Sequence, residues 1–261
     1  MERFAVEVED FSYSYGNGEV IRSLGFRVRE GEYVTIVGPN GAGKTTMLKN
    51  IMRILTGGTG VIKVKGRDVI SYGQKELARE ISYVPQSNGK YYPFSVREFV
   101  LLSKYPYLNP FSRVTPNDER ELEEVLETVH MKRLKDRHMN ALSSGERQKV
   151  MISASLMQKS NILLLDEPTT FLDPRHQDEI NRILKRLNRE LNITVVSVTH
   201  NLNLAAMLSD KILALKDGRA VYFGGVADFL DNSVLGRIYD KEFKLISHPD
   251  KAVKIILPEI I

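Results

Sequence analysis

Apolar residues occupy every second position over residues 4–8 and again over residues 26–28, and the turn sequence Gly16-Asn17-Gly18 lies between these stretches. Alternation with a period of two is typical of strands that bury one face. Residues 1–30 therefore predict antiparallel strands that open the chain as a small β subdomain.

Later stretches are mostly apolar without alternation and are rich in β-branched residues. They are Tyr33–Val37, Ile162–Leu165, Ile193–Val198 and Lys211–Leu215. Continuous apolar runs of this length are typical of strands buried on both faces. We expect them to form a mainly parallel sheet that is covered by helices on both sides.

Helical periodicity follows two of these strands. After Tyr33–Val37 the apolar residues Leu48, Ile51 and Leu55 fall on one face. After Ile162–Leu165 a second helix is expected to begin with Asp173 as its N-cap and Pro174 at its first position. Its buried stripe is formed by Ile180, Ile183, Leu184 and Leu187.

Between about residues 87 and 158 the pattern is mostly helical, as in Asp118–Val129. The predicted fold class is therefore α/β, with a mainly parallel sheet, an N-terminal antiparallel β subdomain and an inserted helical subdomain. We assign 1–86 and 159–225 to the β subdomain and core, 87–158 to the helical subdomain, and 226–261 to a weakly patterned C-terminal extension.

The composition changes this interpretation little. The 261 residues are 42% apolar and 27% charged, which is ordinary for one composite globular domain. The formal charge of +4 suits a phosphate ligand, an anionic membrane or a plain surface, and the lack of cysteine excludes disulfides. Residues 1–4 lack a basic stretch followed by an apolar one, so no signal peptide is expected, and no apolar run reaches 18 residues. Any membrane role is expected to come through a partner.

A glycine-rich loop separates the strand Tyr33–Val37 from the helix that follows it. The loop reads Gly38-Pro39-Asn40-Gly41-Ala42-Gly43-Lys44-Thr45-Thr46 and matches the phosphate-binding pattern G-x-x-x-x-G-K-[S/T] in the required context. Its backbone N–H groups would cradle phosphates, Lys44 would reach the β- and γ-phosphates, and Thr45 would ligate Mg²⁺. The core is thus predicted to be a phosphate-loop NTPase.

Two adjacent carboxylates, Asp166 and Glu167, end the apolar strand Ile162–Leu165. The carboxyl end of a buried parallel strand is where such a sheet presents its chemistry. Asp166 fits the carboxylate that binds Mg²⁺, and Glu167 fits the group that polarises the attacking water.

A second short motif, Leu142-Ser143-Ser144-Gly145-Glu146, resembles the LSGGQ signature of ABC-type ATPases. The order of features along nearly the whole chain is similar to that family. In order, they are Tyr15, the phosphate loop, Gln86, the signature, Asp166-Glu167, the turn Leu172-Asp173, and His200.

The resemblance implies that two copies associate head to tail, with each ATP between the phosphate loop of one copy and the signature of the other. Ser143 and the backbone N–H of Gly145 would meet that phosphate, and Ser143 is also expected to cap a helix. The sequence departs from the family pattern at Ser144, in place of glycine, and at Glu146, in place of glutamine.

The resemblance also implies roles for two residues outside these motifs. Gln86 would contact Mg²⁺ or the attacking water, while its loop senses a permease. His200 would hydrogen-bond the γ-phosphate and hold Glu167 and the water in line.

Tyr15 is expected to stack on the adenine, with Tyr13 as the alternative, because Tyr13 lies two residues away on the same strand. Asp173, in the Leu172-Asp173 turn, is also assigned to the nucleotide site. No functional role is assigned to the remaining mid-chain histidines, which are His130, His138 and His176.

The implied function is ATP hydrolysis, with ATP and Mg²⁺ as cofactors, by a subunit of an ABC importer. The expected partners are a second copy, a polytopic membrane permease and, indirectly, a substrate-binding protein, with no nucleic acid. The expected location is the cytoplasmic face of the cell membrane. The sequence lacks the coiled-coil insertion of DNA-repair ABC proteins and the second phosphate loop of translation-associated ones. A plain phosphate-loop kinase would not carry the signature.

Segments outside the ATPase motifs indicate the cargo. Phe94–Val100, Lys104–Leu108 and His200–Ala206 are similar to segments of ATPases that serve iron-siderophore, haem and cobalamin importers, with departures at Ser103-Lys104 and Asn201. Import of an iron complex or cobalamin is therefore favoured. The alternatives are an ABC importer of another solute and a non-transport ABC ATPase.

Overall fold

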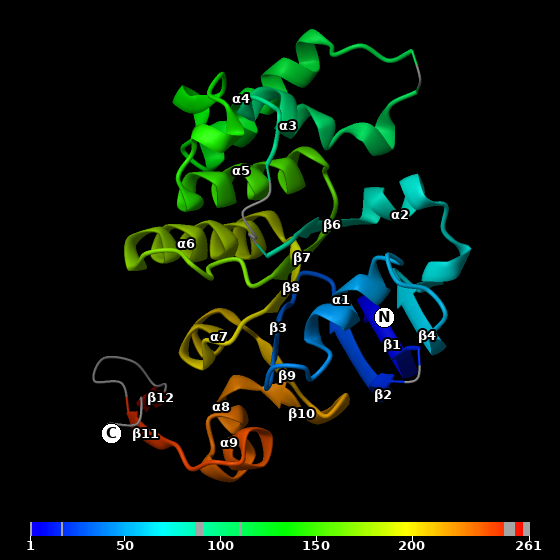
Figure 1. The fold of residues 1–261 in the computed structure, drawn as a ribbon, viewed down its shortest axis with the longest axis vertical. Helices are drawn as coiled ribbons and strands as arrows, with labels where there is room; N and C mark the ends of the chain where they lie inside the picture. Colours follow the sequence, from blue (N-terminus) through cyan, green and yellow to red (C-terminus); the bar gives the residue numbers. More distant parts are fainter. Residues whose placement is uncertain (1, 17, 87–90, 110, 248–253, 258–261) are drawn as a thin grey trace. The chain divides into compact units, whose positions relative to one another are not determined.

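The computed structural model describes residues 2–16, 18–86, 91–109, 111–247 and 254–257. The chain forms two compact units, one made of Met1–Ser71 with Thr194–Ile261 and the other of Tyr72–Ile193 (Figure 1). Several predicted features lie outside the described residues. They are the turn residue Asn17, residues 87–90 of the helical insertion, and residues 248–253 and 258–261 of the C-terminal extension.

The first unit contains an antiparallel sheet, as the alternation near the start of the chain predicts. Its strands are β1 (Phe4–Tyr15), β2 (Gly18–Arg29), β4 (Thr59–Val64) and β5 (Arg67–Asp68), in the order β2-β1-β4-β5. Val6 pairs with Val28 on one side and with Val64 on the other, and all three side chains are buried. The alternating apolar positions therefore form one buried face.

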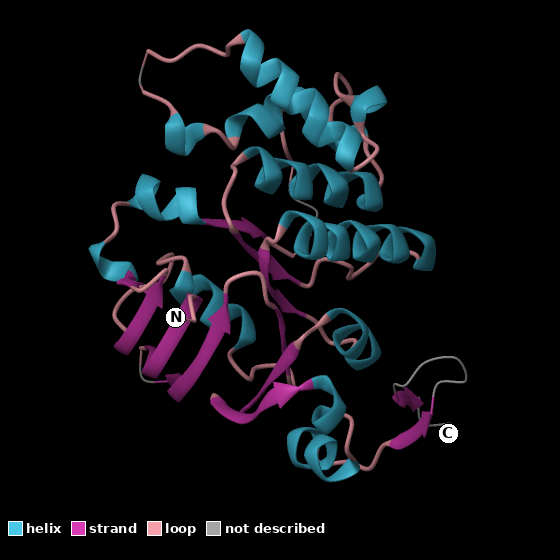
Figure 2. Cartoon of the chain, turned by 180° about the vertical axis from the view of Figure 1, so that it is seen from behind, coloured by secondary structure: helices cyan, strands magenta, loops and turns pink. Residues whose placement is uncertain are grey.

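A second sheet in the same unit carries the continuous apolar runs. Strand β3 (Tyr33–Val37) lies parallel to β8 (Thr194–Val198) and to β9 (Lys211–Lys216), and β10 (Arg219–Gly225) joins β9 antiparallel. Every residue of β3 and β8 is buried. Figures 1 and 2 show the reason, because helices α1 (Lys44–Ile51) and α7 (Leu202–Leu208) lie on opposite sides of β3.

The C-terminal extension has more structure than its weak pattern predicted. It forms helices α8 (Val226–Phe229) and α9 (Asn232–Tyr239), followed by the antiparallel pair β11 (Lys244–Ser247) and β12 (Lys254–Leu257). These elements are short, so periodicity alone carries little signal for them. The remaining element of the first unit is the 3₁₀ turn η1 (Val69–Ser71).

The second unit is mostly helical. Strands β6 (Ile81–Val84) and β7 (Ile162–Asp166) pair in parallel. The helices are α2 (Gln74–Glu80), α3 (Val96–Leu102), α4 (Pro116–Thr128), α5 (Ser144–Met157) and α6 (Pro174–Leu191). The 3₁₀ turns are η2 (Tyr105–Tyr107), η3 (Lys132–Leu134) and η4 (Met139–Ala141). In the described residues of both units, no helix is long and apolar enough to cross a membrane.

The helix starts follow the sequence signals. Asp173 caps α6 by accepting a hydrogen bond from the His176 N–H, and Ser95 and Glu98 form a reciprocal capping box at α3. The expected stripe of α6 is buried. One expectation is wrong, because α1 ends at Ile51 and Leu55 lies outside it. The bend there begins with Arg53, whose φ of 54° is left-handed and ends regular helix.

A charge cluster fastens α4 to the segment after α3. The Lys104 ammonium contacts Asp118 and lies 2.9 Å from Glu121. The hydrogen bond from Lys104, followed by those from Thr115, lowers the pKa of Asp118 from 3.8 to about 2. A carboxyl whose pKa is lower in the folded state stabilises that state above its unfolded pKa.

We expect Asp118→Asn to lower the free energy of unfolding at pH 7 by about 1 kcal/mol, allowing for solvent screening. The difference from the native chain should shrink as the pH falls from about 4 to about 2, because both states then bind the proton. Urea unfolding at pH 7 and pH 3 measures it. The control is Glu124→Gln, an exposed carboxyl on the same helix. Equal stability of Asp118→Asn and the control at pH 7 would contradict the expected contribution.

Candidate active site

The phosphate loop connects β3 to α1 in the first unit, as the motif predicts. Gly38 has φ 141°, and a Cβ there would lie 2.0 Å from the carbonyl oxygen of Leu215 on β9. Gly43, the N-cap of α1, has φ 95°, and a Cβ would lie 2.9 Å from the Val20 carbonyl oxygen. Only glycine combines these dihedral angles with this close approach. The loop is therefore held in shape by strands on either side of it.

Lys44 is the first residue of α1 and is only 7% exposed. Its ammonium donates hydrogen bonds to the carbonyl oxygens of Gly38 at 2.8 Å and Pro39 at 2.7 Å. The Ala42 N–H also donates to Pro39, at 3.3 Å. These bonds hold the one cation of the motif inside the curve of the loop, where phosphate charge is expected.

Thr45 and Thr46 follow in the first turn of α1 and are partly buried. The Asn50 side-chain amide donates to the Thr46 carbonyl at 2.9 Å, which ties this turn to the next one. The N–H groups at a helix start carry positive partial charge and favour an anion. Loop, lysine and helix start therefore form one anion-binding element.

A residue that sequence reasoning missed supports this loop from the C-terminal extension. The Tyr239 hydroxyl, on α9, accepts a hydrogen bond from the Gly38 N–H, and burial raises the pKa of this tyrosine to about 12. The apolar residues Val234, Leu235 and Ile238, which are buried on the same helix, are a signal that could have identified α9 in the sequence.

In the second unit β7 delivers Asp166 and Glu167 at its carboxyl end, as expected. Asp166 is buried, and the Tyr83 hydroxyl on β6 donates to its Oδ2 at 3.2 Å. Burial, with the nearby Asp166 charge as a second cause, raises the pKa of Tyr83 above its ordinary range. Tyr83 therefore stays a donor at any physiological pH and fixes the orientation of this carboxylate.

Glu167 has a φ of 50°, in the left-handed region that costs a residue with a Cβ about 1–2 kcal/mol. Its Oε2 accepts hydrogen bonds from the Gln86 amide and the Thr170 hydroxyl, each at 3.0 Å. Strain of this kind persists where the surroundings hold it, and it is concentrated at functional sites. The second unit thus brings Gln86 and Glu167 together, and it adds Thr170.

The signature motif begins α5. Ser143 is the N-cap, and its hydroxyl accepts from the Glu146 N–H at 3.3 Å while Glu146 accepts from the Ser143 N–H at 2.9 Å. Glutamate in place of glutamine therefore completes a capping box. Ser144 is exposed, whereas Gly145 is buried.

Gly145 and Asp173 both contact His176, a histidine that no sequence motif singles out. A Cβ at Gly145 would lie 2.3 Å from the His176 ring, so glycine is needed there. Asp173 lies 2.6 Å from the ring Nδ1, and the backbone N–H of His176 lowers the pKa of Asp173. One ring thus links the signature helix to the turn that precedes α6.

Tyr15, Tyr13 and His200 belong to the first unit. Tyr15 is 48% exposed, whereas Tyr13 is 8% exposed and packs edge-on against it, with ring centroids 5.0 Å apart. Tyr15 therefore has the accessible ring and Tyr13 supports it. His200 is exposed and lies between β8 and Asn201, the N-cap of α7. Stacking by Tyr15 and phosphate contact by His200 stay predictions.

Comparison with known proteins identifies the class. A family model described as ABC transporter matches residues 21–170, so the chain belongs to the ABC transporter family. An ATP-binding cassette of that class, solved as a dimer with ADP and phosphate in a post-hydrolysis state, superposes with a TM-score of 0.73 at 28% identity, covering 85% of this chain and 98% of that one. The phosphate-loop NTPase fold and the resemblance to ABC ATPases are confirmed.

Two relatives are ATP-binding proteins for the transport of iron compounds. The chain is 32% identical to the iron(3+)-hydroxamate import ATP-binding protein FhuC of Bacillus subtilis (strain 168), covering 94% of this chain and 91% of that protein. It is also 32% identical to the ferric enterobactin transport ATP-binding protein FepC of Escherichia coli (strain K12), covering 96% and 92%. A metal-chelate type ABC transporter in an inward-facing conformation superposes with a TM-score of 0.85 at 25% identity, covering 98% of both chains.

We expect Lys44→Ala to weaken ATP binding by about 10- to 100-fold, because hydrogen bonds to a charged group contribute about 1.5–3 kcal/mol. Titration with a fluorescent ATP analogue measures this, and far-ultraviolet circular dichroism checks that the fold is kept. Lys49→Ala, later on the same helix, is the matched control and should bind ATP normally. Equal affinity of the two variants would remove Lys44 from the site.

Proposed function

We propose that the chain is the ATP-hydrolysing subunit of an ABC importer that takes up an iron complex, such as a siderophore or haem, or cobalamin. It acts as a head-to-tail pair at the cytoplasmic face of the membrane, on a polytopic permease supplied by a substrate-binding protein. The proposal that the chain hydrolyses ATP rests on Glu167. Its backbone is strained, and its carboxylate is oriented by Gln86 and Thr170.

The phosphate loop and Lys44 bind the phosphates of ATP. The loop meets them with backbone N–H groups, and the lysine is already held at the inner side of the curve. Mg²⁺ prefers oxygen ligands, and the Thr45 hydroxyl and the Asp166 carboxylate would hold it, with Gln86 as a further ligand. When bound, Mg²⁺ neutralises charge that develops on the phosphate oxygens.

Glu167 accepts the proton of the attacking water or orients that water. The hydrogen bonds that Gln86 and Thr170 donate to its Oε2 orient the carboxylate for that role. Gln86 would also make hydrolysis sensitive to the permease, because movement of Gln86 would change the orientation of the Glu167 carboxylate. His200 would hold the γ-phosphate in line with that water.

The signature requires a second copy of the chain. Ser143 begins α5, and the start of a helix of this length favours an anion. The phosphate loop already binds the phosphates of the chain's own nucleotide. The signature is therefore assigned to the nucleotide of the partner copy. Binding of two ATP molecules closes the pair, and hydrolysis opens it, which moves the permease.

The import class rests on the relatives and on one surface segment. In the Tyr105–Tyr107 turn the two tyrosines are exposed and Pro106 is buried. The turn is held in place, because Arg79 donates to the Pro106 carbonyl at 2.9 Å and Lys75 lies 4.4 Å from the Tyr105 ring centroid. A rigid aromatic turn on the helical unit suits contact with a permease. The alternatives are an importer ATPase for another solute and a non-transport ABC ATPase.

We expect Glu167→Gln to retain ATP binding and to lower turnover by roughly 10²- to 10⁴-fold. The substituted amide still offers an oxygen to Gln86 and Thr170, so the local geometry is kept while the base is lost. With ATP the variant should run as a dimer in sizing chromatography. Adding Ser143→Arg to the same chain should abolish that dimer, because the arginine enters the shared phosphate site.

A Glu167→Gln variant that hydrolyses ATP at the native rate would remove Glu167 from the reaction. An ATP-dependent dimer that persists with Ser143→Arg would argue against sites shared between copies.

Deleting the gene should reduce growth and uptake when iron is limiting and a ferric siderophore, haem or cobalamin is supplied. The native chain should restore uptake and the Lys44→Ala chain should not, because transport depends on ATP. Normal uptake of all three nutrients, with loss of an unrelated solute such as an amino acid, would overturn the cargo and leave the ATPase standing.

A further inference from the structure

Helix α7 begins at Leu202, two residues after His200, and is short. Asn201 caps it, with its side-chain oxygen accepting the Leu204 N–H at 3.0 Å. A helix of this length is not stable by itself in water, so its position depends on what it packs against. The position of His200 depends on the same contacts, because one residue separates it from the helix.

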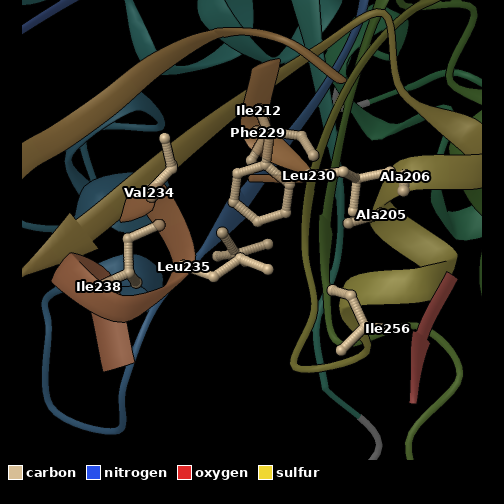
Figure 3. Close-up of a cluster of buried hydrophobic side chains, with 11 residues drawn as sticks. Ala205, Ala206, Ile212, Phe229, Leu230, Val234, Leu235, Ile238 and Ile256 are labelled. Atoms are coloured by element: carbon tan, nitrogen blue, oxygen red, sulfur yellow. The ribbon is translucent and has the colours of Figure 1, made fainter. Parts of the chain in front are cut away.

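The buried apolar residues of α7 are the small Ala205 and Ala206, and the partly buried Leu202 packs beside them. Ala205 and Ala206 lie in a buried cluster together with Val37, the last residue of β3, and with Ile256 of strand β12 (Figure 3). The remaining members are Ile212, Ala214, Phe229, Leu230, Val234, Leu235 and Ile238. Alanine side chains allow close approach but interlock little with their neighbours. Apolar packing therefore sets the distance of α7 from the sheet more firmly than its position along it.

A polar contact supplies the missing restraint. The Asn203 amide donates to the Ile256 carbonyl oxygen at 2.9 Å, and its side-chain oxygen accepts the Ile256 N–H at 2.8 Å. Both bonds go to one residue, so the side chain pairs with β12 as a neighbouring strand would. Only an amide provides a donor and an acceptor in this geometry: aspartate lacks the donor, and leucine, of similar size, lacks both.

The hairpin that receives Asn203 is itself anchored. Ile256 is 7% exposed in the cluster, and the Lys254 ammonium donates to the Leu230 carbonyl at 3.3 Å. Ile256 pairs with Leu245 of β11 in the hairpin register, while its own N–H and carbonyl are taken by Asn203. The open edge of β12 is therefore closed by one side chain from α7.

We infer that Asn203 is a positioning residue for hydrolysis: by bonding both backbone groups of Ile256 it fixes α7 on the C-terminal hairpin and thereby holds His200. This inference rests on the role of His200 in the proposed function. It makes the hairpin a part of the ATPase machinery.

The test measures steady-state ATP hydrolysis by the full-length chain. Asn203→Leu should lower kcat about tenfold and change the KM for ATP less than twofold, because ground-state binding is made by the phosphate loop. Asn203→Asp, which keeps the acceptor, should lie between Asn203→Leu and the native chain. Asn232→Leu, an exposed asparagine at the start of α9, is the matched control and should show native kinetics.

Double variants separate positioning from general damage. In a His200→Ala chain, Asn203→Leu should cause no further loss of kcat, because the residue that it positions is gone. The contact can also be changed at Ile256. The Ile256→Pro variant loses the backbone N–H that bonds Asn203, whereas Ile256→Ala keeps it. The proline variant should therefore have the lower kcat.

The outcomes are distinguishable. Slow hydrolysis by His200→Ala with native kcat for Asn203→Leu would overturn the inference and leave the proposed function intact. A further loss in the double variant would also overturn it, since Asn203 would then act elsewhere. Native kcat for His200→Ala would remove the proposed role of His200, and the inference would fall with it.

Discussion

The close approach of the phosphate loop to the backbone of its neighbours is the constraint on which the site depends. Gly38 lies against Leu215 of β9, and Gly43 lies against Val20 of β2, at distances that leave no room for a Cβ. The loop is therefore shaped by two different sheets, and its curvature places Lys44 against its own carbonyl oxygens. Strand packing in the first unit thus determines the shape of the loop that is proposed to bind phosphate.

In the second unit the candidate site residues are held by side-chain hydrogen bonds, whereas in the first unit the loop is held by close backbone contacts. Tyr83 and Gln86, at the end of β6 and just beyond it, each donate to one of the two acids that end β7. Thr170 adds a second donor to Glu167, which keeps a left-handed backbone that it would not adopt without support. Strain and orientation have the same cause, because the bonds that hold the backbone in place also aim the carboxylate.

The C-terminal extension contributes to both functional elements of the first unit. Tyr239 accepts the N–H of Gly38 at the start of the phosphate loop, and Asn203 joins α7 to β12. Both contacts join the extension to elements next to nucleotide chemistry. Tyr239, which lies outside the matched ABC transporter region of residues 21–170, thus contacts the phosphate loop inside that region.

The sequence by itself determined the features that depend on near neighbours. These are the phosphate loop in its strand-helix context, the helix cap at Ser143, and the start and buried stripe of α6. Only the tertiary structure decided that Asn203 bonds Ile256, which is 53 residues away, that His176 fills the space beside Gly145, and that Tyr15 rather than Tyr13 is exposed. The physical reason is that hydrogen-bond caps and hydrophobic periodicity are set within a few residues along the chain. Contacts between residues far apart in the sequence depend on how whole helices and strands pack. Such packing leaves no pattern in the local sequence.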